Sequence, residues 1–286
     1  MNKSRKAPVL LLLPGLFIMI ATVMLPILRT FVFSLQEYNL KEPDDIRFIG
    51  LKNYVKVLGA SDFHLALKNS LWIMLFVGIF TLLASLFVAL LLNRRTKVTS
   101  LLTAVAIIPW ALPPLVNGMM WNFIFYPGYG LMNRLLIGAG LIVDPISFTT
   151  HPFLFLIVVS VATSWRVVPF CALLILANLQ SIPSELYDAA KVDGSSRWQS
   201  FRKITFPLIL PSLSVVLVKI LMAAMNIFDE VIAMVGFRLD SQTLLVNNYL
   251  HTFSYLDFGY GSAITYVIML LSAVISYFYI KDMTEA

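Results

Sequence analysis

The stretch ELYDAAKVDGSSRWQSFRKITFPLILP, residues 185–211, is the longest polar interruption between two apolar runs in the C-terminal half of the chain. Pro183 precedes a short helical pattern, and Gly194 with the two serines after it ends that pattern. A second amphipathic pattern follows over residues 198–204, and two prolines lead from it into the next apolar run. We therefore predict an elbow over residues 185–211, made of a helix, a glycine corner and a second helix, whose shape suits docking into a groove of another protein.

The runs on either side of the elbow belong to a chain that is too hydrophobic for a soluble globular protein. Its 286 residues are 59% hydrophobic and 13% charged, and the mean hydropathy is +0.85. A helix of about 20 residues crosses a hydrocarbon core of about 30 Å, and six runs reach that length. We predict an all-α membrane protein, one domain over residues 1–286, with six transmembrane helices at about 8–34, 69–92, 101–125, 153–177, 208–228 and 261–280.

The distribution of charge sets the expected orientation of these helices. Segments at about 35–68, 126–152 and 231–260 carry balanced or acidic charge, whereas basic residues are in excess elsewhere outside the runs. Lysine and arginine excess marks the cytoplasmic side, so we expect both termini and the elbow inside and those three segments outside. The net charge of +6 then reflects topology, and no nucleic-acid partner is implied. The basic residues expected inside are Lys3, Arg5, Lys6, Arg94, Arg95, Lys97, Lys191, Arg197, Arg202 and Lys203.

Motifs for catalysis are missing from the sequence. It has no glycine-rich loop followed by Lys-Ser/Thr, no serine–histidine constellation and no paired catalytic motif within an apolar run. The single cysteine, Cys171, forms no intrachain disulfide, and the spacing of the three histidines predicts no metal site. We expect neither an enzyme nor a chain that holds a metal or cofactor. An ion-coupled secondary transporter stays as the alternative class, although it would need internal repeats and midplane carboxylates that we do not find.

The elbow resembles the EAA loop of permeases from binding-protein-dependent ABC importers. The sequence has Asp-Ala-Ala at 188–190, Asp-Gly at 193–194 and Ile-Thr-Phe-Pro at 204–207, where the family pattern has Glu-Ala-Ala, Gly and Ile-x-Leu-Pro. Aspartate for glutamate and phenylalanine for leucine are the departures. The flanking sequence Leu-Gln-Ser-Ile-Pro at 179–183 is similar to the sugar branch, of the maltose, trehalose and glycerol-phosphate type. The resemblance implies the fold of a type I ABC importer permease.

The resemblance also implies partners and a location. A second, homologous permease would complete a heterodimer, two cytoplasmic ATPase subunits would bind ATP and Mg²⁺, and a periplasmic or lipid-anchored binding protein would deliver a sugar. The chain would be a multi-pass protein of the bacterial inner membrane, in contact with lipid. Its coupling loop, at about 178–207, would rest in a groove of the ATPase. The candidate coupling residues are Glu185, Tyr187, Asp188, Ala189, Ala190, Asp193, Gly194 and Arg197.

The third and fifth runs suggest a pathway through the membrane. Three prolines at 109, 113 and 114 predict a kink, which either lines a pathway with the polar residues after it or only serves packing. In the fifth run, Lys219, Ala223, Asn226 and Glu230 follow i, i+4, i+7, i+11 spacing and would share a helix face. With the positions that the family resemblance adds, the candidate pathway residues are Asn117, Trp121, Thr163, Arg166, Val167, Phe170, Lys219, Ala223, Ala224, Asn226, Ile227 and Asp229, and Ile220 is a further position that the resemblance implies.

Two cations stand near the expected midplane of the membrane. Arg166 lies in the fourth run and Lys219 in the fifth, and along a continuous helix Asp229 would lie about 15 Å beyond Lys219. On that geometry the chain offers no acid at the depth of the two cations. Either a carboxylate of the partner subunit pairs with them, or the substrate is an acidic or phosphorylated sugar, such as a uronate oligosaccharide or glycerol phosphate.

Overall fold

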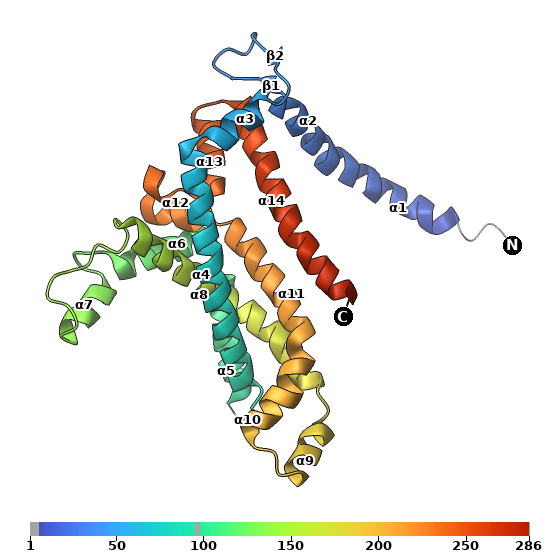
Figure 1. Cartoon of the computed structure of the whole chain (residues 1–286), viewed down its shortest axis with the longest axis vertical. Coiled ribbons are helices and arrows are strands. Elements are labelled where there is room, and N and C mark those ends of the chain that lie inside the picture. The colour runs from blue at the N-terminus through green and yellow to red at the C-terminus, as the bar shows by residue number, and fades with distance from the viewer. Residues whose placement is uncertain (1–5, 95–97, 286) are drawn as a thin grey trace. The chain divides into compact units, whose positions relative to one another are not determined.

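The computed structural model describes residues 6–94 and 98–285, with the side chains of 6–10, 275, 276 and 278–285 left aside. Lys3, Arg5, Arg95 and Lys97, which contribute to the expected orientation, lie outside the described residues. The described chain is helical apart from short connections and one two-stranded antiparallel ribbon (Figure 1). It divides into two compact units, Met1–Phe63 with Asn247–Leu271, and His64–Val246 with Ser272–Ala286.

The first unit joins the N-terminal helices to the start of the last helix. Asn53 holds the connection after the first apolar helix, because its side-chain amide donates to the carbonyl of Ser34 at 3.0 Å and of Gln36 at 2.8 Å. Asp62 accepts from the Asn247 amide at 3.1 Å and lies 2.9 Å from the His251 ring. The elements of this unit are α1 (Lys6–Met19), a π-helical turn (Ile20–Met24), α2 (Leu25–Ser34), β1 (Gln36–Glu37), β2 (Arg47–Phe48), α3 (Lys52–Gly59), the start of α4 (Ser61–Leu92), the end of α13 (Leu244–Tyr249), a second π-helical turn (Leu250–Ser254) and the start of α14 (Phe258–Glu285).

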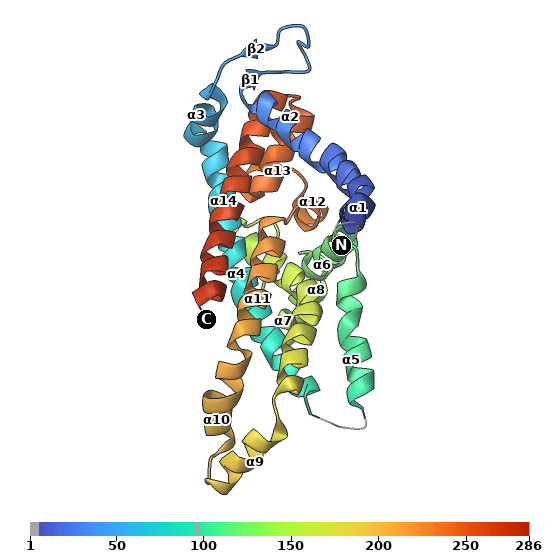
Figure 2. The same ribbon diagram turned by 90° about the vertical axis from the view of Figure 1, so that its right-hand side faces the viewer.

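The second unit contains the elbow and the fourth and fifth apolar runs. Within it α8 packs against α6 and α11, and α12 packs against α6. Figure 2 shows α8 and α11 side by side, with α9 and α10 at the end of this unit. Its elements are the rest of α4, α5 (Thr99–Ile107), a 3-10 turn (Ile108–Ala111), α6 (Pro114–Phe125), α7 (Leu131–Gly138), α8 (Pro152–Ser181), α9 (Ser184–Val192), α10 (Arg197–Ser200), a third π-helical turn (Phe201–Thr205), α11 (Phe206–Met225), α12 (Asp229–Val235), a second 3-10 turn (Leu239–Ser241) and the start of α13.

Four helices of the described chain are long and apolar enough to cross a membrane: Leu11–Ser34, Ser61–Leu92, Pro152–Ser181 and Arg197–Met225. The third run is a broken pair, Thr99–Ala111 and Pro114–Phe125, bent by 98°. The predicted proline kink is therefore confirmed. It arises because Pro113 is extended and its ring, with that of Pro114, excludes a continuing helix. The last predicted span lies in α14, of which the described apolar segment is Phe258–Val274, so the described residues show four of the six predicted spans, or five if the bent pair is one span.

The elbow folds as predicted, as a helix, a glycine corner and a second helix. Helix α9 begins directly after Pro183, and Gly194 turns the chain at φ +75°, a left-handed conformation that favours glycine. Ser196 and Gln199 then form a capping box that starts the second arm. The second arm continues through the π-helical turn Phe201–Thr205 and past Pro207, so that one helix runs from α10 through α11.

The fifth run ends earlier than the hydrophobic pattern indicates. Helix α11 stops at Met225, where the Asn226 side-chain amide donates to the carbonyl of Met222 at 2.7 Å, and a new helix, α12, begins at Asp229. The hydroxyl of Thr243 donates to the carbonyl of Ile227 at 2.9 Å and so satisfies the interrupted backbone. The predicted continuous helix through Glu230 is therefore wrong, and the offset of about 15 Å calculated from it for Asp229 no longer applies.

Candidate functional site

Six of the predicted pathway residues line one small cavity of about 300 Å³ in the second unit. Its walls come from α8, α11 and the 3-10 turn before α6, so the kink in the third run contributes to it. The cavity mixes aromatic, aliphatic and charged side chains, which is typical of sites for polar small molecules. Its lining residues are Trp110, Arg166, Val167, Phe170, Lys219, Met222, Ala223 and Asn226.

One of the two cations in this cavity is neutralised within the chain. The guanidinium of Arg166 donates from Nε at 3.1 Å and from Nη2 at 2.9 Å to Oε1 of Glu230. The side chain of Glu230 is 3% exposed and that of Arg166 is 21% exposed, so the pair is largely shielded from solvent. We expected no carboxylate of this chain near either cation, and for Arg166 that expectation is wrong. The helix break after α11 places Glu230, on α12, beside Arg166 on α8.

A glycine on α6 allows Glu230 to reach this position. A Cβ atom on Gly118 would lie 2.7 Å from Cβ of Ala233 and 2.9 Å from the backbone of Glu230. Helix α12 therefore sits directly on the glycine of α6. The neighbouring Asn117 is fully buried and donates to the carbonyl of Ala162 at 3.0 Å, which fixes α6 against α8. The Arg166–Glu230 ion pair thus depends on the packing of α6 between α8 and α12. Glycine at position 118 permits that packing because it has no side chain.

Lys219 is the second cation, and its environment is different. Its Nζ atom lies 5.7 Å from the centroid of the Phe170 ring, within cation–π range. The Phe170 ring stacks in turn on Trp110, with 5.7 Å between centroids and 24° between planes. Among the residues that the structure describes, no carboxylate forms an ion pair with Lys219. The cavity consequently carries one positive charge that the described chain leaves without a counter-ion.

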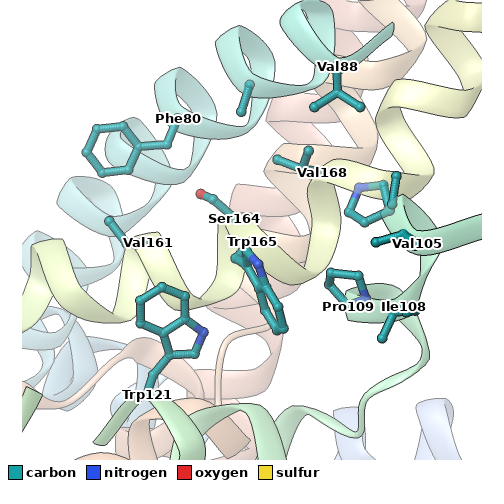
Figure 3. A pocket seen from close by; sticks show the side chains of 13 residues that line it. Phe80, Val88, Val105, Ile108, Pro109, Trp121, Val161, Ser164, Trp165 and Val168 are labelled. Carbon is teal, nitrogen blue, oxygen red and sulfur yellow. The ribbon is translucent and has the colours of Figure 1, made fainter. Parts of the chain in front are cut away.

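A larger cavity, of about 670 Å³, lies between α4, α8 and the bent third run (Figure 3). Its walls are almost wholly apolar, and Trp121 lines it together with Val161, Trp165 and Pro169. The Ser164 hydroxyl, the Trp121 indole nitrogen and little else there can form hydrogen bonds. A sugar needs many such partners when it leaves water, so this cavity suits it less than the charged one does.

The elbow exposes most of its predicted coupling residues. Its two arms enclose a polar concavity of about 560 Å³, and they are joined by a hydrogen bond of 2.9 Å between the hydroxyls of Tyr187 and Thr205. Tyr187 is half-buried and Ala190 is buried between the arms, whereas the other candidates are exposed. Beside them, Val192 is 88% and Trp198 69% exposed, which is unusual for large apolar side chains unless a partner covers them. The exposed candidates are Glu185, Asp188, Ala189, Asp193, Gly194 and Arg197.

Comparison with known proteins agrees with this combination of elbow and apolar helices. The family model described as "binding-protein-dependent transport system inner membrane component" matches residues 81–285. This chain belongs to that family. It is accordingly a multi-pass membrane protein that acts in transport and is not an enzyme, and the resemblance given by the elbow is confirmed.

Named relatives place the permease among sugar systems. It is 33% identical to the trehalose/maltose transport system permease protein MalF of Thermococcus litoralis, over 98% of this chain and 94% of the relative. It is 32% identical to the sulfoquinovosyl glycerol transport system permease protein SmoG of Agrobacterium fabrum, over 97% and 90%. The crystal structure of a bacterial ABC transporter that imports the acidic polysaccharide alginate shares the fold, with a TM-score of 0.85 and 22% identity over 99% of this chain and 96% of the other.

The permease does not bring all predicted pathway residues together. Asn117, Thr163, Ala224 and Ile227 are buried in helix packing, Trp121 lines the apolar cavity, and Asp229 is half-buried at the start of α12. Two lining residues were missed, Trp110 and Met222, and Glu230 was placed on a helix face with Lys219 without its pairing to Arg166. Trp110 lies beside the kink prolines, which was a usable signal, whereas the position of Glu230 depends on a helix break that carries no proline or glycine.

Proposed function

We propose that this permease forms half of the translocation pathway of an ATP-driven importer for a sugar or sugar derivative. The observation that carries the proposal is the single helix Arg197–Met225, which connects the elbow to the charged cavity. Lys219 lies 22 residues beyond Arg197 on it, about 33 Å away at the helical rise of about 1.5 Å per residue. A displacement of the elbow is therefore transmitted to the cavity wall by a rigid element, without an intervening loop.

In this proposal the elbow, within a coupling loop at about 178–207, rests in a groove of a cytoplasmic ATPase. Ala189 and Ala190 permit a close approach, Gly194 makes the corner, and the Tyr187–Thr205 hydrogen bond keeps the arms at a fixed angle. Two such ATPase subunits bind ATP and Mg²⁺, and their closure tilts the helices from an inward-open to an outward-open arrangement. The remaining candidates, Glu185, Asp188, Asp193 and Arg197, supply exposed polar contacts at that surface.

A second permease completes the pathway in this proposal. Within its own unit, the span Leu11–Ser34 contains no buried residue in its apolar window, so it needs lipid or further protein surface to cover it. We infer a heterodimer with a homologous permease. Each permease has six transmembrane helices, and both termini of this chain lie in the cytoplasm of a bacterial cell. A periplasmic or lipid-anchored binding protein delivers the sugar to the outer segments at about 35–68, 126–152 and 231–260. The whole chain, 1–286, then acts as one membrane domain.

The proposal is tested by purifying the tagged permease from its native membrane and reconstituting the complex in vesicles. We expect a nucleotide-binding subunit and a second permease to co-purify, and we expect sugar uptake that requires ATP and the binding protein. Uptake that runs at full rate on an ion gradient, with no ATPase attached, would overturn the proposal in favour of an ion-coupled secondary transporter.

A further inference from the structure

We propose that the sugar carries an anionic group, a carboxylate, sulfonate or phosphate, and that Lys219 binds it. This inference rests on the proposed function, because it takes the cavity between α8 and α11 as part of the sugar pathway. It does not follow from the number of cations alone. It follows from a difference between the two cations, because among the described side chains Arg166 is paired with a carboxylate and Lys219 is not.

The first step is the charge of the cavity. Two cations line it, and Glu230 neutralises Arg166 through two hydrogen bonds to one carboxylate oxygen. Among the side chains that the structure describes, which exclude those of residues 278–285, no carboxylate forms an ion pair with Lys219. The net charge that the cavity presents to a ligand is therefore about one positive unit, and it is located at Lys219.

The second step is the cost of that charge. Lys219 lies in the helix Arg197–Met225, which is long and apolar enough to cross the membrane. An ammonium in such a segment is expensive unless it faces water or finds a counter-ion, and such groups usually mark a pathway. Arg166 is paired with Glu230 at this site, whereas the contact that the described residues give Lys219 is the face of Phe170, and Lys219 stays exposed.

The third step is the shape around the ammonium. Trp110 and Phe170 form a stacked aromatic pair, and a flat apolar face of this kind can contact the C–H groups of a sugar ring. Asn226, seven residues or about two helical turns beyond Lys219, adds an amide to the lining. A volume of about 300 Å³ is at the small end for ligand sites, so we expect it to hold one charged sugar unit rather than a long oligosaccharide.

The experiment compares probes that differ only in charge at one position. The probes are the methyl glycosides of glucose, glucuronic acid, sulfoquinovose and glucose 6-phosphate, which carry a neutral group, a carboxylate, a sulfonate and a phosphate at the sixth carbon. Binding to the complete purified transporter is measured by titration calorimetry and by quenching of Trp110 fluorescence, with Trp110→Phe as the reference for that signal. Lys219→Met removes the charge at nearly constant length, Lys219→Arg keeps it, and Lys56→Met removes an exposed charge of the first unit.

We expect at least one anionic glycoside to bind more tightly than the neutral one. Lys219→Met should weaken that binding by about 10- to 100-fold, the range for loss of a charged hydrogen bond, and leave the neutral glycoside nearly unchanged. Lys219→Arg should retain most of the preference, and Lys56→Met all of it. Loss of the preference in Lys219→Met with an intact, assembled complex is the supporting result.

Three outcomes overturn the inference, and one of them also removes its basis. Binding of neutral sugars alone shows that no anion is preferred, while the proposed sugar function stands. Failure of the Lys219→Met subunit to assemble, or an equal loss for neutral and anionic probes, assigns Lys219 to the structure of the complex and not to binding of an anion. An assembled, ATP-hydrolysing transporter that imports no sugar at all, charged or neutral, contradicts the proposed function itself.

Discussion

Glu230 is the residue on which the charge of the cavity depends. Its carboxylate is nearly inaccessible and receives both hydrogen bonds from Arg166, so neither group can lose the other without leaving a shielded, uncompensated charge or acceptor. The energetic value of such a pair is asymmetric. Removing one partner is costly, whereas replacing both by apolar side chains can be nearly neutral.

We predict that Glu230→Gln destabilises the permease by about 2 kcal/mol, somewhat below the range for a fully buried pair because Arg166 keeps a fifth of its side chain exposed. Thermal unfolding of the purified complex measures the change. The double variant Arg166→Met with Glu230→Leu serves as the control and should be more stable than Glu230→Gln alone. A double variant that is less stable than Glu230→Gln alone would mean that the pair does not couple α8 to α12.

At this scale the sequence predicts the residue types of the site better than their contacts. The sequence identifies Arg166 and Lys219 because charged side chains in an apolar run are unusual, and it identifies Phe170 because Phe170 shares a helix face with Arg166. It does not identify the partner of Arg166, because that residue lies 64 positions away along the chain and on the far side of a helix break. A pairing of that kind is set by tertiary packing, which the hydrophobic periodicity of one run does not contain.

Among the helices, α12 is held in place chiefly by its close contact with α6. Gly118 is the contact point, since even a single methyl group there would overlap Ala233 and the backbone of Glu230. Gly78, on α4, is the natural comparison because a Cβ atom there would meet nothing within 4 Å. The two glycines are both helical, so they separate the cost of crowding from the general effect of an added methyl group.

We predict that Gly118→Ala costs about 1–3 kcal/mol through overpacking and lowers transport, because α12 is displaced and the Arg166–Glu230 pair opens. Gly78→Ala should be neutral or slightly stabilising, since alanine is the better helix former. Thermal stability and ATP-driven uptake in vesicles give the two readouts. Equal behaviour of the two variants would contradict the close seating of α12.

The corner of the elbow depends on backbone conformation rather than on space. Gly194 has φ +75°, and a Cβ atom there would meet nothing within 4 Å. We predict that Gly194→Val costs about 1–2 kcal/mol locally and lowers sugar uptake per ATP hydrolysed by about 10-fold, whereas Gly194→Asn retains coupling because asparagine tolerates the left-handed region. Uptake and hydrolysis are measured on the same vesicles. Full coupling in Gly194→Val would remove the corner from the mechanism.

The elements themselves were predictable where a local signal marks them. Proline and glycine positions correctly gave the kink before α6 and the start and corner of the elbow. The break after Met225 was missed because the sequence MAAMNIFDEVIAM contains neither residue, and only Asn226 with its bond to Met222 closes the helix there. The continuity through Pro207 was not predicted, because a proline normally interrupts a helix, and here it follows a π-helical turn.

At the scale of the whole molecule, the proposed orientation is accessible through the single cysteine. Cys171 is buried, so the Cys171→Ser background should accept new cysteines without interference. We predict that Asp44→Cys, between β1 and β2, reacts with a membrane-impermeant maleimide in intact cells, whereas Ser195→Cys at the elbow reacts only after the membrane is opened. Labelling of Ser195→Cys from outside would reverse the topology and separate the elbow from any cytoplasmic ATPase.

The interruption at 226–228 gives the cavity a property that a straight helix would not have. Glu230 neutralises Arg166 only while the short segment Asp229–Val235 rests on Gly118. With that segment docked the ligand meets a single surplus charge, and with it lifted the ligand meets two. A transport cycle that moves this segment would change the affinity of the cavity for an anion. The affinity would be higher with the segment lifted and lower with it docked.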